Sequence, residues 1–151
     1  MKKILLIIGF LLMTCFTFAQ TNDNNGKSMW PILNNMQTII DTVEHRGFEI
    51  VRLEYDIVKT DSKASYRILT DVWTYRIGVI GDYRSLDMDI EVYKQSDDGT
   101  YILISQDNKT ESFAYVDITP TTTGWYKFVV KCSRFQAGYN SCHYGLIIFH
   151  N

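Results

Sequence analysis

The segment from Leu86 to Tyr93 alternates apolar and acidic side chains, and no other stretch constrains the fold of this chain so strongly. It reads Leu-Asp-Met-Asp-Ile-Glu-Val-Tyr, and its apolar residues occupy every second position: Leu86, Met88, Ile90 and Val92. Side chains of a β-strand point alternately to its two faces, so a period of two predicts a strand with one buried face. The opposite face would present three carboxylates to water. The chain therefore needs a sheet that is covered on one side.

Further short runs of β-branched and aromatic residues, separated by turn signals, follow one another from Phe48 onward. Between two of these runs, Asp98-Gly99 is a strong hairpin signal because both residues tolerate a positive φ. We expect about eight strands, near residues 48–57, 66–69, 73–80, 86–94, 101–105, 112–118, 126–132 and 142–149. This pattern predicts a mainly β protein, an antiparallel β-sandwich or jelly roll.

One amphipathic helix is expected before the strands, at residues 28–46. Its apolar residues recur at spacings of three and four: Met29, Leu33, Met36, Ile40 and Val43. Ser28 is a suitable N-cap, and Gly47 provides a left-handed stop. We expect the apolar stripe of this helix to dock either on the sheet or on a partner.

The first nineteen residues have the pattern of an export signal. Lys2 and Lys3 precede an apolar run that ends in a small-x-small site, which predicts cleavage after Ala19. Cys15 is a poor match to a lipoprotein site, so plain export is favoured over lipidation. No segment of the mature chain reaches the ~20 apolar residues of a membrane span. We expect a secreted or periplasmic protein with a flexible lead at 20–27 and one domain at 28–151.

Export would leave 132 residues, with 13 basic and 17 acidic side chains and a formal charge of −4. That length suits a single domain. Because the chain is mildly acidic and lacks a cluster of Lys or Arg, nucleic acid and anionic lipid are disfavoured as partners. The oligomeric state does not follow from these features.

Cys132 and Cys142 would be the two cysteines of the exported chain, and an oxidising compartment predicts a disulfide between them. If residues 126–132 and 142–149 form a hairpin, the two cysteines can meet across its ladder. The loop between them would carry the candidate ligand-binding residues: Arg134, Phe135, Gln136, Tyr139 and Asn140. These residues could stack on a sugar ring or dock on a protein. The alternative is that Phe135 or Tyr139 folds back and caps the sandwich.

The acidic stripe is a candidate calcium site, because Ca²⁺ takes six to eight oxygen ligands. Residues two apart on a strand are separated by about 6.6 Å, so all three acids of the stripe cannot converge on one ion. A site would need one pair and loop oxygens, which gives Asp82, Asp87 and Asp89 as the candidates. The simpler interpretation is a solvated face whose charge discourages edge pairing.

No catalytic motif accompanies these features. The three histidines show no zinc-ligand spacing, and no Gly-x-Ser-x-Gly elbow is present. The sequence does not exclude a pair of carboxylates for glycoside cleavage, because the distance between two carboxylates in space cannot be seen in a sequence. We expect a protein that is not an enzyme and has no cofactor, with calcium as the one alternative.

Residues 66–149 resemble the bacterial pre-peptidase C-terminal domain at the level of pattern. The matching segments are Tyr75-Arg76-Ile77 leading to Gly81-Asp82, the alternating strand 86–93, a turn at Gly99, Gly124-Trp125-Tyr126 and Tyr144-Gly145-Leu146. The resemblance implies a jelly-roll-like sandwich that serves as a non-catalytic accessory. Some members of that family are collagen-binding or calcium-stabilised modules.

Two functions from different classes follow. The first is a secreted binding module that recognises an extracellular glycan or protein through sandwich loops. The second is a structural or assembly subunit of a cell-envelope or secreted complex that uses the helix at 28–46 as its partner surface.

Overall fold

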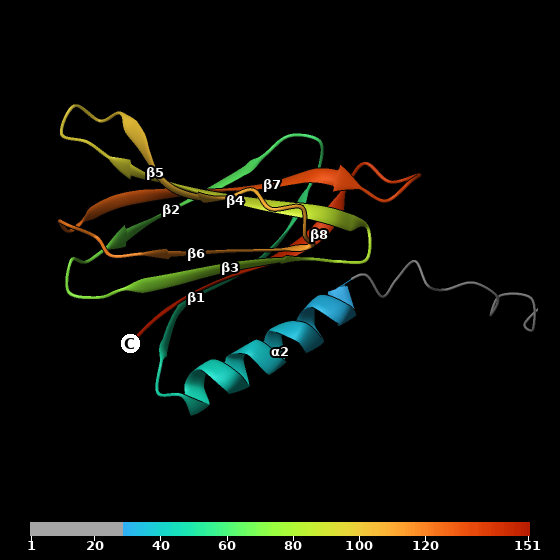
Figure 1. The fold of residues 1–151 in the computed structure, drawn as a ribbon, viewed down its shortest axis with the longest axis horizontal. Helices are drawn as coiled ribbons and strands as arrows, with labels where there is room; N and C mark the ends of the chain where they lie inside the picture. Colours follow the sequence, from blue (N-terminus) through green and yellow to red (C-terminus); the bar gives the residue numbers. More distant parts are fainter. Residues whose placement is uncertain (1–28) are drawn as a thin grey trace, which may run out of the picture.

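One helix and eight strands make up residues 29–151, the part of the chain that the computed structural model describes (Figure 1). The helix is α2 (Met29–His45), and the strands are β1 (Glu49–Val58), β2 (Lys63–Leu69), β3 (Tyr75–Gly81), β4 (Ser85–Gln95), β5 (Tyr101–Asp107), β6 (Phe113–Ile118), β7 (Gly124–Phe135) and β8 (Cys142–His150). The expected export signal, the flexible lead and the Ser28 cap lie outside the described residues.

The strands form two four-stranded antiparallel sheets. One sheet has the order β1-β8-β3-β6 and the other β2-β7-β4-β5; we call them sheet A and sheet B. Within the described chain, β4 and β5 are consecutive strands of one sheet, whereas each other connection crosses between the sheets. This is the strand order of a jelly roll, and it confirms the predicted mainly β, eight-stranded sandwich with an N-terminal helix.

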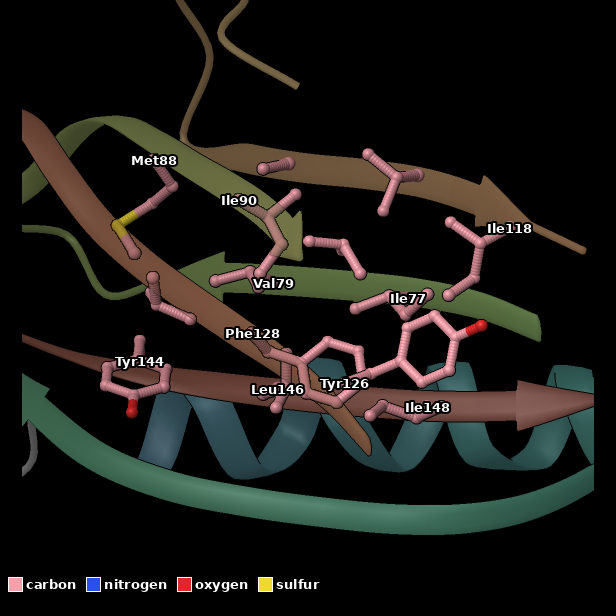
Figure 2. Close-up of a cluster of buried hydrophobic side chains, with 14 of the residues drawn as sticks. Ile77, Val79, Met88, Ile90, Ile118, Tyr126, Phe128, Tyr144, Leu146 and Ile148 are labelled. Carbon is pink, nitrogen blue, oxygen red and sulfur yellow. The ribbon is translucent and has the colours of Figure 1, made fainter. Parts of the chain in front are cut away.

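The core lies between the two sheets and is built by the alternation seen in the sequence. In sheet B, Met88 and Ile90 of β4 point inward, as does Phe128 of β7 (Figure 2). They meet residues of sheet A such as Val79 and Leu146, and all five are fully buried. The inward residues of the strands thus give each sheet one apolar face, and the apolar faces of the two sheets pack against each other.

Leu86 is the exception in the alternating segment 86–93. It is 42% exposed, whereas its neighbour Ser85 is buried. Two register shifts flank Asp87 in the ladder between β4 and β7, and a shift of one residue turns a side chain to the other face. The expected core position of Leu86 is therefore wrong, and the regular alternation begins at Met88.

The helix α2 covers the outer face of sheet A, as Figure 1 shows. Its buried residues Ile32, Met36 and Val43 face β8 and β1. A Cβ on Gly145 of β8 would lie 3.0 Å from Met36 Cε, so the glycine permits this close approach. Gly47 has a φ of 78° and ends the helix as predicted.

Most of the apolar stripe of the helix is thus covered within the same chain, but Leu33, expected in the stripe, is exposed and Ile32 is buried instead. The hypothesis of an assembly subunit relied on that stripe as a partner surface, and its docking on sheet A removes this basis. Trp30 and Leu33 of the helix remain exposed. No helix in the described residues combines the length and hydropathy needed to cross a membrane.

The predicted hairpin between the last two strands is wrong. Strand β7 lies in sheet B between β2 and β4, so both of its edges are already paired, and β8 lies in sheet A between β1 and β3. Cys132 and Cys142 are therefore on opposite sheets, and both are buried free thiols in this structure. Burial, followed by the neighbouring Cys132 thiol, raises the pKa of Cys142.

Candidate functional site

The outer face of sheet B carries a group of aromatic side chains that point away from the core. On β7, Tyr126 and Phe128 are buried, and the alternate residues Trp125 and Lys127 face outward. Tyr66 of β2 lies opposite Lys127 in the ladder. We call the outward residues of this region the aromatic face: Tyr66, Tyr93, Gln95, Tyr101, Trp125 and Lys127.

The aromatic face is held together by ring and cation contacts. The rings of Tyr66 and Tyr101 meet edge to face, with centroids 5.7 Å apart. The Lys127 ammonium lies 4.2 Å from the centroid of Tyr93 and 5.0 Å from that of Tyr101. Such contacts position aromatic rings on the surface without removing them from solvent.

Two hollows meet at Trp125, which is 47% exposed. The first has a volume of about 470 Å³ and lies between the β4–β5 and β6–β7 connections. The second, about 340 Å³, is lined by Tyr66, Gln95, Tyr101 and Trp125. Gln95 and Trp125 line both hollows. The first hollow is lined by Lys94, Gln95, Ser96, Asp97, Ile102, Ile104, Thr122, Thr123, Gly124 and Trp125.

The β4–β5 turn beside the first hollow is well ordered by its own hydrogen bonds. The Asp98 carboxylate accepts from Ser96 Oγ at 2.6 Å and from the Thr100 amide at 2.9 Å. These bonds, led by the one from Ser96, lower the pKa of Asp98 to about 2. Gly99 has a φ of 85°, as the hairpin signal predicted. One wall of the hollow is therefore preorganised.

The β7–β8 loop, which carries the candidate ligand-binding residues, lies at the opposite end of the sandwich (Figure 1). Phe135 is half-buried and packs against the core, as in the capping alternative. The Gln136 amide donates to the Arg84 carbonyl at 2.9 Å and thereby ties the loop to the β3–β4 connection. Tyr139 stays 43% exposed and meets Tyr83 edge to face at 5.8 Å. Arg134 and Asn140 are exposed.

Asp82 is committed to a buried hydrogen-bond cluster between the β3–β4 connection and β8. Its carboxylate accepts from Arg84 Nε at 2.8 Å, from the Arg84 amide at 2.9 Å and from the His143 amide at 3.1 Å. Its side chain is fully buried. A buried carboxylate needs such partners, so Asp82 joins two segments of the fold.

The other two calcium candidates, Asp87 and Asp89, lie on β4, and their carboxylates have different surroundings. Asp89 accepts a hydrogen bond from Ser133, and one carboxylate oxygen of Asp87 is buried without a partner. Within residues 29–151, no three His, Cys, Asp or Glu side chains come together as metal ligands. The structure therefore does not bring Asp82, Asp87 and Asp89 together.

Sequence reasoning missed the aromatic face, although a signal for it was present. Along the strand expected at 126–132, the period of two puts Tyr126 and Phe128 on one face, and Lys127 with the preceding Trp125 on the other. A tryptophan and a lysine on the same face of a strand are a weak sequence signal for a surface site. What could not be seen was that β2, β4 and β5 add their tyrosines beside it.

No family model matches the chain, and no curated protein matches its sequence. Solved structures share the fold. They include CorA of Methylomicrobium album BG8, a surface-associated copper-binding protein, which is 10% identical with a TM-score of 0.51 over 64% of this chain and 91% of that chain. PliG from Aeromonas hydrophila, a periplasmic inhibitor of g-type lysozyme, is 9% identical, with a TM-score of 0.49 over 66% of this chain and 85% of that chain.

The fold-level resemblance to the pre-peptidase C-terminal domain is also found. That domain of the collagenase from Bacillus anthracis is 12% identical, with a TM-score of 0.44 over 63% of this chain and 87% of that chain. Identities this low establish a shared architecture and nothing about the site.

Proposed function

We propose that this protein is a non-catalytic binding module that holds an extracellular glycan on the aromatic face of sheet B. The observation that carries the proposal is Trp125, an exposed tryptophan that lines two neighbouring hollows. An extracellular ligand also fits the export signal expected from the sequence.

The chemistry of the two hollows suits a sugar. One face of a pyranose ring is a set of C–H groups, which pack well on an indole or phenol ring, while its hydroxyls need polar partners. Tyr66 and Tyr101 add rings around Trp125, and Gln95 adds an amide at the centre. Ser96 and Thr123 add hydroxyls in the first hollow. The volume of each hollow falls within the range of ordinary ligand pockets.

The composition of the hollows supports binding rather than hydrolysis. Asp97 is the single carboxylate among the described residues that line them, whereas glycoside cleavage ordinarily uses two. We favour this face over the β7–β8 loop because Phe135 is packed on the core and the loop has no exposed tryptophan.

Replacing Trp125 tests the proposal. The wild-type mature protein is expected to bind at least one polysaccharide in a glycan array, and Trp125→Ala should weaken that binding at least about tenfold. The reason is that a central aromatic anchor commonly contributes about 2 kcal/mol or more to an interface. Affinities would be measured by isothermal titration calorimetry with the polysaccharide that the array identifies.

The matched control is Trp30→Ala, because Trp30 is a more exposed tryptophan on α2, on the far side of sheet A (Figure 1). This variant should bind as the wild type does. The proposal is wrong if no glycan binds, or if Trp125→Ala binds as tightly as the control. If Tyr139→Ala alone abolishes binding, the ligand site is the β7–β8 loop instead.

A further inference from the structure

The Lys127 ammonium is the one feature of the aromatic face that stacking on a neutral sugar does not use. Its Nζ lies over the rings of Tyr93 and Tyr101, at 4.2 and 5.0 Å from their centroids. A cation held against ring faces is fixed in position and partly desolvated, but its N–H groups remain able to donate. The two tyrosines therefore preorganise a positive charge on the surface of the sheet.

Lys127 makes no ion pair of its own, unlike its neighbour on the strand, and Glu91 acts on it only from beyond ion-pair distance. The ammonium of Lys131, four residues further along the same face of β7, pairs with Glu91. The other oxygen of Glu91 accepts a hydrogen bond from Tyr93 Oη at 2.6 Å, so each oxygen of this carboxylate already has a partner. Among residues 29–151, Lys127 takes part in no ion pair.

The unpaired ammonium borders the hollows at Trp125. The two residues are two positions apart on β7 and face the same way, which separates them by about 6–7 Å. Lys127 lies opposite Tyr66 in the ladder, and Tyr66 lines the second hollow. A substituent on a sugar stacked on Trp125, or on the next sugar of the chain, would therefore reach the ammonium.

A second lysine lies at this end of the molecule, in the hollow that Asp97 also lines. Lys94 lines the first hollow, and its ammonium donates to the Thr122 hydroxyl rather than to a carboxylate. A half-buried cation attracts an anion more strongly than a fully solvated one, because less water screens it. On β4, Lys94 alternates with the outward residues Tyr93 and Gln95, so Lys127 is the cation of the aromatic face. Through Lys127 this face favours an anionic ligand, although the chain as a whole is mildly acidic.

We propose that the glycan bound by this face carries carboxylates, as uronate-containing polysaccharides do, and that Lys127 pairs with one carboxylate while Trp125 stacks on the sugar ring. This inference rests on the proposed function and deepens it by naming the class of glycan. It also assigns Lys127 as the residue that distinguishes acidic from neutral chains.

A pair of polymers with the same sugar backbone, one charged and one neutral, provides the test. Affinity electrophoresis would compare polygalacturonate with its fully methyl-esterified form, and would then extend to alginate, hyaluronan and a sulfated glycan. The wild type is expected to bind at least one uronate polymer about fivefold or more tightly than its esterified form, and Lys127→Gln should remove that preference. Added salt should weaken the binding of the wild type more than that of the variant.

Lys59→Gln is the matched control, because it removes the same charge from an exposed site between β1 and β2. It should bind as the wild type does. The inference is overturned if no uronate polymer binds, if only the sulfated glycan binds, or if Lys127→Gln keeps the preference. Binding of neutral glycans that Trp125→Ala abolishes and Lys127→Gln leaves unchanged would overturn the inference while the proposed function stands.

Discussion

At the scale of single residues, glycines decide where elements of this sandwich can approach each other. A Cβ on Gly81 would lie 2.5 Å from Ser85 Cβ and 3.0 Å from Met88 Cγ. The chain turns sharply there from β3 to β4, and no side chain fits between the two strand ends. Gly145 has the same role under the helix, where Ile32 and Met36 occupy the space of a side chain.

We expect Gly81→Ala to destabilise the protein by about 1–3 kcal/mol, the usual cost of overpacking a filled site. The free energy of unfolding would be measured by urea denaturation. Gly124→Ala is the control, because Gly124 also lies in a strand but has no atom within 4 Å of an added Cβ. Equal stabilities of the two variants would show that the close approach at Gly81 is not what requires a glycine.

At the scale of elements, the helix and the last strand depend on each other. Strand β8 is buried on both faces, with Leu146 and Ile148 in the main core and Ile147 and Phe149 under the helix. Its sequence accordingly reads as a nearly continuous apolar run instead of an alternating one. The helix in turn buries Met36, which makes α2 part of the folded domain and explains why its stripe is wide.

Met36→Ala should therefore lower the free energy of unfolding by about 2–4 kcal/mol, through lost burial and a cavity between α2 and sheet A. Gln37→Ala, at the adjacent exposed position, should change it by less than about 0.5 kcal/mol. Urea unfolding followed by circular dichroism measures both. A small effect of Met36→Ala would mean that the helix is not docked in solution.

At the scale of the whole molecule, the crossing connections decide which residues meet. Because β7 and β8 lie in different sheets, Cys132 and Cys142 come together in the core rather than on a hairpin. The same connections place the β3–β4 and β7–β8 loops at one end and the hollows beside Trp125 at the other. The two surfaces considered for binding are thus separated by the length of the sandwich.

The state of the cysteines can be checked directly. If both thiols are free and buried, a thiol reagent such as DTNB should label the folded protein slowly, since burial protects the sulfurs and raises the pKa of Cys142. Unfolding in urea should expose two reactive thiols per exported chain. An absence of reactive thiols in urea without reductant would instead show that the two cysteines form a disulfide in the exported protein.

Much of the architecture was predictable from local pattern. The periods of two and 3.6 located eight strands and one helix, and the helix stop at Gly47 and the turn at Gly99 followed from residue types that tolerate positive φ. Prediction failed at Leu86, where bulges shift the register, because a bulge depends on how β4 pairs with β7. It also failed for the pairing of β7 with β8, which depends on the edges that other strands occupy.

The sequence by itself determined the fold class, because alternation and turn chemistry act over a few residues and leave a visible pattern. Only the tertiary structure decided the candidate site. Trp125, Tyr66 and Tyr101 come from three strands that are far apart in the chain, and their meeting requires the β2-β7-β4-β5 order of sheet B. Such side chains are brought together by the pairing of strands that are distant in the sequence. The spacing of residues along the chain does not reveal which strands pair.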